Sequence, residues 1–466
     1  MEERFNCKLG DLFEFEYGKG LTKKQRNEIG NYPVYGSNGI VGFHDEYLIE
    51  GPAIIVGRKG AAGEVAFEKK NLWPIDTTYF VKVPEYLDFM FSFFLLKSLV
   101  LSQLDKSTAI PGLNRNDAYN LNINLPPLPE QRAIVSKIEL LFSELDNGIA
   151  NIKLAQEQLK VYRQAVLKKA FEGELTKKWR EQQTDLPDAG DLLEQIYSER
   201  EKAVKATKVK PVKPFTENEL ILLPKIPKEW CWVRLEDVGN AIDPQPSHRT
   251  PPIFENGIPY VGVGDIDKET GEFDYNKARK VSPTVLEEHL ERYSIDEGDF
   301  IIGKIGTIGK PFLIPIRRFY TLSANVVLIK SNDHYCLKKY MFYLSKSQIV
   351  EKQFLQGSKA TTQAAFGIQK VRILNIPLCF LPEQQAIVQE IEKRLSVCDK
   401  IEQDIKENLE KAEALRQSIL KKAFEGKLLN ERELAEVRGA EDWESAEVLL
   451  ERIRAEKTAS GKKGRS

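Results

Sequence analysis

Two stretches of the chain carry apolar residues at seven-residue spacing, which is the pattern of a long helix with one apolar seam. In the first stretch the two rows are Ile138, Leu145, Ile152, Leu159, Val166 and Ile134, Leu141, Gly148, Ala155, Tyr162. In the second stretch they are Ile391, Cys398, Ile405, Ala412, Ile419 and Ile387, Ile401, Leu415, with Arg394 and Asn408 interrupting the second row. Because burial stabilises an apolar seam, we predict that the two helices pair with each other. The alternative is that each helix packs separately on a globular core.

Prolines and glycines indicate where both helices begin and end. Pro129 and Pro382 lie near the start, where a missing backbone N–H costs nothing, and Gly173 and Gly426 lie where a helix should end. A helix over residues 131–170 would be about 60 Å long at ~1.5 Å per residue.

The two helical stretches are near copies of each other. Residues 128–175 align with residues 381–428 at a constant offset of 253 (381 − 128), and 24 of the 48 aligned positions are identical. The similarity resumes at residues 192–196 and 449–453, at an offset of 257 (449 − 192). Such an internal repeat predicts a pseudo-twofold arrangement in which the two helices run antiparallel.

The segments that precede the helices are also related, although less closely. Both contain short β-branched runs cut by glycines, such as residues 53–57 and 300–303. Both also contain one short apolar helix, near residues 86–101 and 337–350. Mixed strands and helices predict an α+β domain of about 130–150 residues in each half.

The predicted order along the chain is domain, long helix, linker, domain, long helix. The linker is rich in lysine and proline without periodicity, and the polar tail at residues 456–466 is expected to be frayed. The predicted boundaries are 1–127 for the first domain, 128–204 for the first helical region, 205–227 for the linker, 228–380 for the second domain and 381–466 for the second helical region with the tail.

Composition narrows the function classes. The formal net charge is −1 and the pI is near 6.5, which argues against non-specific coating of nucleic acid but permits local basic patches. The N-terminus carries acids where a secretory signal needs bases, and no apolar run is long enough for a membrane span, so we expect a cytoplasmic chain. The five cysteines are scattered and the four histidines lack zinc-site spacing, so we expect reduced thiols and no metal site.

No catalytic motif is complete. The glycine-rich residues 303–310 have the wrong spacing for a phosphate-binding loop, and Pro311 stands where Ser or Thr is needed. Residues 261–265 only weakly resemble a methyl-donor loop, and the Asn/Asp-Pro-Pro-aromatic motif of adenine methyltransferases is lacking. Residues 68–70 have the Glu-x-Lys spacing of a nuclease site without a partner carboxylate. We therefore expect no catalytic residues.

The glycine loops have a better interpretation as nucleic-acid contacts. Residues 57–60 and 303–306 follow a strand at matching places of the two halves, and their cations suit phosphates or guanine edges. A second pair of polar segments precedes each long helix. The candidate DNA-contacting residues are Arg58, Lys59, Lys106, Thr108, Asn114, Arg115, Lys304, Thr307, Lys359, Thr361, Thr362 and Gln363. The alternative is that these segments are ordinary surface turns.

The motifs at the helix ends resemble those of a known family. Each long helix opens with Leu-Pro-Glu-Gln, at residues 128–131 and 381–384, and closes with Lys-Lys-Ala-Phe-Glu-Gly, at residues 168–173 and 421–426. Two dissimilar domains that alternate with two near-identical helices resemble the specificity subunit of type I restriction–modification enzymes, and the resemblance covers essentially the whole chain. The start of the second domain, Ile-Pro-Lys-Glu-Trp at residues 226–230, fits the family, whereas the first domain lacks this start.

The resemblance implies a function that spacing alone does not show. Each domain would be a target recognition domain for one half of a split, asymmetric double-stranded DNA sequence. The helices would act as a ruler and would dock two methyltransferase (modification) subunits, which use S-adenosylmethionine. Restriction subunits would add translocation and cleavage with ATP and Mg²⁺, so this chain itself would bind no cofactor and would not be an enzyme. Two other classes stay open, a coiled-coil scaffold without DNA specificity and the recognition part of a fused methyltransferase.

Overall fold

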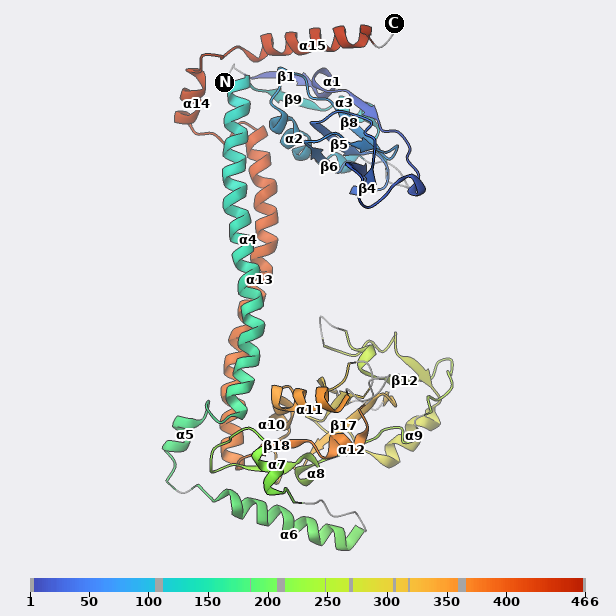
Figure 1. Ribbon diagram of the computed structural model, residues 1–466, viewed down its shortest axis with the longest axis vertical. Helices are drawn as coiled ribbons and strands as arrows, with labels where there is room; N and C mark the ends of the chain where they lie inside the picture. Colours follow the sequence, from blue (N-terminus) through green and yellow to red (C-terminus); the bar gives the residue numbers. More distant parts are fainter. Residues whose placement is uncertain are drawn as a thin grey trace. The chain divides into compact units, whose positions relative to one another are not determined.

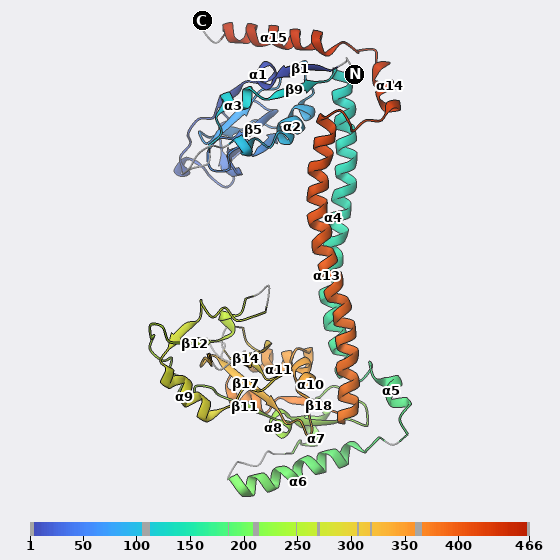
Figure 2. The same cartoon turned by 180° about the vertical axis from the view of Figure 1, so that it is seen from behind.

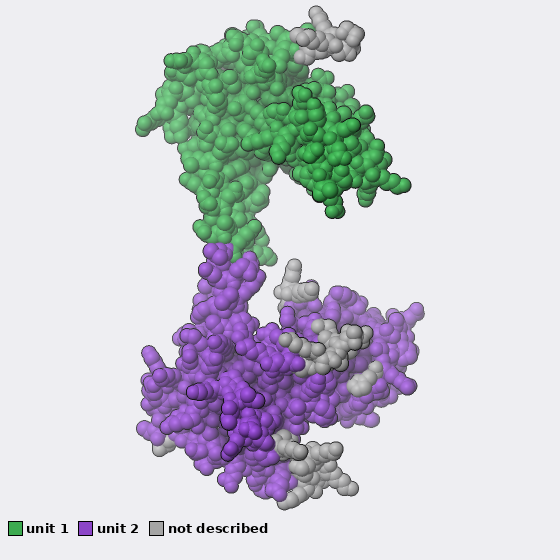
Figure 3. All heavy atoms as spheres, viewed as in Figure 1, with its two compact units in different colours: residues 1–153, 405–466 green, residues 154–404 purple. Residues whose placement is uncertain are grey.

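The computed structural model describes residues 4–104, 112–184, 186–207, 214–247, 249–267, 271–304, 307–316, 319–358 and 366–463. Two compact units divide the chain, one formed by residues 1–153 with 405–466 and the other by residues 154–404 (Figure 3). Each unit contains one α+β domain together with parts of both long helices.

The domain of the first unit is built from three small sheets (Figure 1). Their strand orders are β2-β8-β5-β6, β4-β3-β7 and β1-β9. The strands are β1 (Phe5–Lys8), β2 (Phe15–Tyr17), β3 (Tyr32–Gly36), β4 (Gly39–His44), β5 (Ala53–Gly57), β6 (Val65–Glu68), β7 (Trp73–Pro74), β8 (Thr78–Val81) and β9 (Asn122–Leu125). The helices are α1 (Leu9–Leu12), α2 (Phe89–Ser98) and α3 (Arg115–Tyr119), joined by α14 (Glu431–Arg438) and α15 (Ala446–Lys463).

The domain of the second unit repeats this plan. Its strand orders are β11-β17-β14-β15, β13-β12-β16 and β10-β18. The strands are β10 (Cys231–Arg234), β11 (Gly239–Ile242), β12 (Ile258–Val261), β13 (Arg279–Val281), β14 (Phe300–Gly303), β15 (Pro311–Leu313), β16 (Thr321–Leu322), β17 (Val326–Ser331) and β18 (Asn375–Leu378). The helices are α5 (Lys177–Glu181), α6 (Ala189–Thr207), α7 (Glu217–Ile221), α8 (Leu235–Val238), α9 (Pro283–Arg292), α10 (Lys338–Ser345), α11 (Gln348–Ser358) and α12 (Ile368–Arg372).

The relationship between the two domains is clearer in strand pairing than in sequence. In each, the central strand β5 or β14 pairs antiparallel with both neighbours, and β3 or β12 has one antiparallel and one parallel neighbour. The central strands consist of aliphatic or aromatic residues ending in glycine, and every residue in them is buried. The predicted α+β class and the predicted repeat are therefore confirmed.

The two long helices, α4 (Leu128–Phe171) and α13 (Leu381–Phe424), are 44 residues long each and pair antiparallel (Figures 1 and 2). In the second unit Arg163 Nη2 lies 2.7 Å from Asp399 Oδ1, and in the first unit Arg416 forms an ion pair with Asp146. These two pairs are equivalent, because both members of each pair are displaced by 253 residues (416 − 163 and 399 − 146). The pairing therefore obeys the internal repeat, as the sequence predicts.

The predicted first row is buried throughout α13 but only half-buried at Leu145 and Ile152 of α4, and the second row is partly wrong. Every residue of the row Ile391 to Ile419 is buried, whereas Tyr162, Ile401 and Leu415 of the second rows are 45%, 41% and 50% exposed. Arg163 and Arg416, each one residue after an exposed position of the second rows, form the ion pairs between the helices.

Each long helix ends at the predicted glycine. Gly173 and Gly426 have φ of +77° and +79°, a left-handed conformation that side chains with a Cβ rarely adopt. In both cases the next residue donates its N–H to the carbonyl five positions back, from Glu174 to Lys169 (2.9 Å) and from Lys427 to Lys422 (2.8 Å).

The glutamines of the Leu-Pro-Glu-Gln motif fasten each helix to a domain. The Gln131 Oε1 accepts a hydrogen bond from the backbone N–H of Asp88 (3.1 Å), and the Gln384 Oε1 accepts one from that of Leu337 (2.8 Å). Asp88 and Leu337 are the residues immediately before α2 and α10. The motif therefore holds equivalent helices in the two units.

The adjacent glutamates are buried and paired. Glu383 accepts from Trp230 Nε1 (2.9 Å) and forms an ion pair with Arg180, whereas Glu130 accepts from Arg4 Nε (3.0 Å). Trp230 belongs to the Pro-x-x-Trp start of the second domain. Arg4 contacts the glutamate in the first unit, where this start is lacking.

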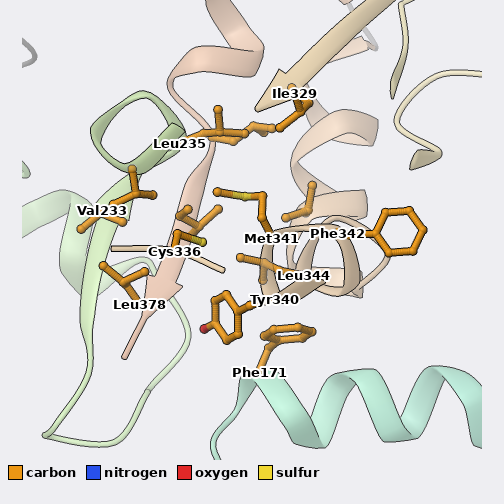
Figure 4. Packing of buried hydrophobic residues seen from close by; sticks show 14 of the residues in the cluster. Phe171, Val233, Leu235, Ile329, Cys336, Tyr340, Met341, Phe342, Leu344 and Leu378 are labelled. Carbon is orange, nitrogen blue, oxygen red and sulfur yellow. The ribbon is translucent and has the colours of Figure 1, made fainter. Parts of the chain in front are cut away.

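The phenylalanines of the closing motif anchor the other helix to the same domains. The Phe171 ring lies 5.3 Å from that of Tyr340 in α10, and the Phe424 ring lies 5.4 Å from that of Phe91 in α2. Figure 4 shows Phe171 of α4 facing Tyr340, with Leu344 close by. Each domain thus packs where the start of one long helix meets the end of the other.

The second stretch of the repeat lies in α6 and α15, which pack on equivalent short helices. Arg200 Nη1 of α6 lies 2.8 Å from Asp237 Oδ1 of α8, and Lys457 Nζ of α15 donates to the Gly10 carbonyl of α1 (2.6 Å). Because α15 continues to Lys463, the expectation of a frayed tail from residue 456 was wrong for this part. Within the described residues, no helix is apolar over enough length to cross a membrane.

Candidate nucleic-acid interface

The described residues of the two glycine loops make equivalent contacts after β5 and β14. A Cβ added to Gly57 would lie 2.0 Å from the Ala61 carbonyl oxygen, and one added to Gly303 would lie 2.3 Å from that of Thr307. The turn closes with a hydrogen bond to the carbonyl of this glycine, from Gly63 N (2.8 Å) or Gly309 N (3.2 Å). The recurrence that the sequence shows therefore reflects a backbone geometry that only glycine allows.

This turn brings the first candidate segment beside the second. The Arg58 carbonyl accepts from the Leu113 N–H (2.9 Å), and the Lys304 carbonyl accepts from the Phe366 N–H (3.0 Å). Arg58 and Lys304 are therefore equivalent positions, and Arg115 lies two residues beyond Leu113. The structure thus brings together the Arg58 and Arg115 segments, which are 57 residues apart in sequence (115 − 58).

In the first unit two guanidinium groups flank one exposed tyrosine. The guanidinium carbons of Arg58 and Arg115 lie 4.8 Å and 5.0 Å from the ring centre of Tyr17, which is 50% exposed. Each arginine also donates to a backbone carbonyl, Arg58 to Asp76 (3.0 Å) and Arg115 to Phe15 (3.2 Å). These contacts hold the two cations in place beside an aromatic face.

Sequence reasoning missed Tyr17. A usable signal was present, because residues 17–26 (YGKGLTKKQR) contain four Lys or Arg and no acid directly after a short strand. Lys19, Lys23 and Lys24 of this run are exposed. The segment therefore forms a local basic patch in a chain whose overall charge is near zero.

In the second unit the equivalent cation is neutralised. Lys304 Nζ lies 3.1 Å from each carboxylate oxygen of Asp243, and both side chains are at most 10% exposed. Strand register makes Ala241 the counterpart of Phe15, because the two pair with the equivalent positions Ile329 and Val81. Asp243 and Tyr17, each two residues further along, are therefore also counterparts. A DNA contact through Lys304 would first have to break this ion pair.

A different arginine occupies the second unit's site. Arg372 donates from Nε and Nη2 to the Ala241 carbonyl (3.3 Å each), the counterpart of the Phe15 carbonyl that Arg115 contacts. Sequence alignment does not equate Arg372 with Arg115, because one ends α12 and the other begins α3. Among the candidates, Thr307 is exposed, and its carbonyl lies beside Gly303.

The remaining candidates are placed as follows. Lys59 and Asn114 are exposed, and Asn114 Oδ1 accepts from the Asn116 N–H at the start of α3. The candidates that lie outside the described residues are Lys106, Thr108, Lys359, Thr361, Thr362 and Gln363. The contacts with DNA of all the candidates stay predictions.

A buried histidine positions a further loop in the second unit. The two ring nitrogens of His289 lie 2.6 Å from Thr321 Oγ1 and 2.7 Å from Gln245 Oε1. Burial, together with the smaller effect of the nearby Arg292, lowers the pKa of His289 to about 4. His289 is therefore neutral near pH 7 and fastens Gln245, which is partly exposed two residues after Asp243.

The possible metal ligands of the described residues are their His, Cys, Asp and Glu side chains. No group of three or more His, Cys, Asp or Glu side chains is arranged there to hold a metal ion. All five cysteines are buried and unpaired.

Comparisons with known proteins agree with this arrangement. A family model described as "Type I restriction modification DNA specificity domain" matches residues 1–154 and again residues 227–411. The chain belongs to this family. The matched segments contain both domains and the start of each long helix, so the specificity domain occurs twice, as the repeat indicates.

Relatives of similar length carry the same description. The type I restriction enzyme EcoDI specificity subunit of Escherichia coli is 26% identical over 464 residues, which cover 98% of this chain and 95% of that protein. The EcoBI specificity subunit of Escherichia coli is 26% identical over 363 residues, covering 77% and 69%. A chain from a solved structure, described as "Structural basis underlying complex assembly and conformational transition of the type I R-M system", matches with a TM-score of 0.59 at 17% identity, covering 92% and 99%.

Proposed function

We propose that this specificity chain reads a bipartite, asymmetric double-stranded DNA target, one half-site with each domain. Its paired helices dock two methyltransferase subunits, and restriction subunits join the complex in the cytoplasm. Catalysis, S-adenosylmethionine, ATP and Mg²⁺ belong to these partners, and this chain contributes recognition. Family membership and the duplicated domain support the proposal.

One observation carries the proposal of two different half-sites. The two domains share strand order and register, yet equivalent positions hold Tyr17 with Arg58 in one and Asp243 with Lys304 in the other. Two domains that recognise different DNA sequences need the same backbone arrangement with different side chains at equivalent positions. A scaffold without DNA specificity would not need two large domains that differ in this way.

The first unit has the chemistry for DNA contact. Arginine side chains contact phosphates and guanine edges, and Arg58 and Arg115 lie at a surface where an aromatic ring is exposed. The basic run at residues 17–26 adjoins this surface and would supply phosphate contacts. A local patch of this kind is compatible with the net charge of −1.

Methylation mapping tests the proposal on the complete chain. The chain is expressed with its methyltransferase subunit in a host that lacks other adenine methylation, and the methylated sites are sequenced. Arg58→Ala and Arg115→Ala should weaken or relax one half-site, and Thr307→Ala and Arg372→Ala the other. A base contact should cost about 1–3 kcal/mol and relax one base position, whereas a phosphate contact should weaken all sequences alike.

Lys69→Ala is the matched control, because Lys69 is an exposed cation on a turn outside both candidate surfaces. It should leave the methylated sequence unchanged. If substitutions in both domains alter the same half-site, the assignment of one reader to each half-site is wrong.

A further inference from the structure

A cavity of about 640 Å³ lies inside the second unit. Its walls come from the end of α4, from α13, from α10 and α11, and from β15 with the residues before it. The lining is largely apolar and includes Leu167, Phe342, Phe354 and Leu395. Cavities of this size and character bind small molecules, which they hold by burial and orient by a few polar groups.

The internal repeat shows that this cavity is not a general feature of the fold. Strand register equates Leu313 with Phe67, because each pairs with the equivalent residue of the central strand, Phe300 or Ile54. The helix offset of 253 equates Leu395 with Phe142 (395 − 142). Leu313 and Leu395 of the lining thus stand where the first unit has a phenylalanine.

Aromatic rings fill the equivalent space in the first unit. The Phe67 ring lies 4.8 Å from that of Phe93, and the Phe142 ring lies 5.8 Å from that of Phe94. A third difference lies in the equivalent helices α2 and α10. The residues before them, Asp88 and Leu337, are offset by 249 (337 − 88), and the same offset places Ser345 at the position of Leu96. Smaller side chains at three equivalent positions therefore open the cavity in the second unit.

A cation without an ion-pair partner lines this cavity. Lys346 Nζ lies 4.3 Å from the ring centre of Phe342, and no carboxylate of the described residues lies within 4.0 Å of it. The surrounding protein lowers the pKa of Lys346 although its side chain is exposed, the neighbouring Arg163 lowers it as well, and Asp399 opposes them. A negatively charged ligand group beside Lys346 would offset the repulsion from Arg163.

The difference between the two units also restricts what kind of molecule could bind in the cavity. Two copies of one partner that dock by the internal repeat would use equivalent surfaces, and the first unit fills this space with aromatic rings. We propose that the cavity is a binding site for one small amphipathic anion per chain. Its apolar body would lie between Leu313 and Leu395, and its carboxylate, sulfonate or phosphate would lie against Lys346.

Titration of the full chain with 1-anilino-8-naphthalenesulfonate, an amphipathic anion, tests this site by fluorescence and calorimetry. We expect saturation at one molecule per chain. Lys346→Met should weaken binding about tenfold, equivalent to about 1.4 kcal/mol. Lys97→Met is the matched control, because Lys97 lies over Phe93 at the equivalent place in the first unit (97 + 249 = 346), and it should change nothing.

A second variant fills the cavity without touching the cation. Leu313→Phe combined with Leu395→Phe copies the first unit and should abolish saturable binding while the thermal unfolding temperature is retained. The uncharged analogue N-phenyl-1-naphthylamine should bind the unaltered chain more weakly than the sulfonate. The proposal is overturned if the filled variant binds as well as the unaltered chain, or if Lys346→Met and Lys97→Met have equal effects.

Discussion

A fragment of residues 1–205 tests whether the repeat alone specifies the helix pairing. It keeps one domain with α4 and most of α6, and it removes α13, so the seam of α4 loses its partner. A second copy of the fragment can replace that partner. Leu167 and Phe171 would then lie where Leu420 and Phe424 lie in the full chain, at the offset of 253 (420 − 167). We expect a homodimer with true twofold symmetry.

The structure gives the size of the driving force. Ile419 and Leu420 are 7% and 1% exposed in the core of the first unit, and in the dimer Val166 and Leu167 replace them. The change from Ile to Val costs about 0.5–1.5 kcal/mol at each end of the dimer. About ten apolar side chains buried in the new interface contribute roughly 15–30 kcal/mol in total. Association costs about 4–15 kcal/mol, so dimerisation at micromolar concentration or below is expected.

Charge pairs contribute much less than the seam. In the dimer Arg163 of each copy would face Asp146 of the other, which reproduces the two ion pairs of the full chain. Because Asp146 is 60% exposed, each pair is worth under about 1 kcal/mol. Arg163→Ala should therefore leave the dimer intact. Val166→Glu should give a folded monomer, because residue 166 is exposed on the helix of a monomeric fragment and buried only in the dimer.

Sedimentation equilibrium measures the association, and circular dichroism verifies that each variant is folded. With the methyltransferase subunit present, the methylated site of the fragment should become a palindrome of the first half-site. A folded fragment that stays monomeric at high micromolar concentration would refute the reasoning that the copied seam suffices for pairing.

Three further outcomes are expected. The purified chain should show no methyl transfer with S-adenosylmethionine and no cleavage with Mg²⁺ and ATP, and turnover that copurifies with the chain through ion-exchange and size-exclusion steps would contradict this. Asp243→Asn should release Lys304, so that DNA affinity at the second half-site rises and its salt dependence steepens by about one phosphate contact, measured by fluorescence anisotropy at several salt concentrations. His289, with a pKa near 6.5 unfolded and about 4 folded, should make the second unit less stable as pH falls from 6.5 to 4, by up to about 3 kcal/mol. Urea unfolding of His289→Gln should lack that part of the pH dependence.

The helical half of the fold was predictable from the sequence because its determinants are local. Seven-residue spacing gives the seam, and Gly173 and Gly426 end the helices through their own backbone conformation. The antiparallel pairing agrees with the duplication, since a twofold axis perpendicular to the helices relates the two copies. The second seam row was partly wrong, since Tyr162 and Leu415 are 45% and 50% exposed while the first row stays buried along α13.

The candidate site was predictable only where it depends on backbone geometry. The loops at Gly57 and Gly303 were found because the same turn demands glycine in both halves. Tyr17 and Asp243 were missed because their roles depend on strand register, which pairs residues far apart in sequence. Arg372 was missed for a related reason, since it reaches the shared carbonyl position from the end of a helix that sequence alignment places differently.

The structure separates the residues that hold the frame from those that give each domain its chemistry. Gln131 and Gln384 hold the frame through backbone groups at equivalent helix starts, so their contacts do not depend on the loop side chains. The loop cations differ in residue type and in their neighbours, since Arg58 lies over an exposed ring while Lys304 is held in a nearly buried ion pair. Releasing such a buried lysine without removing its carboxylate would cost several kcal/mol, more than the ~1–3 kcal/mol of one base contact. On the proposed function we therefore expect Lys304 to stay in its ion pair, and we expect Arg372 and Thr307 to contribute more than Lys304 to recognition of the second half-site.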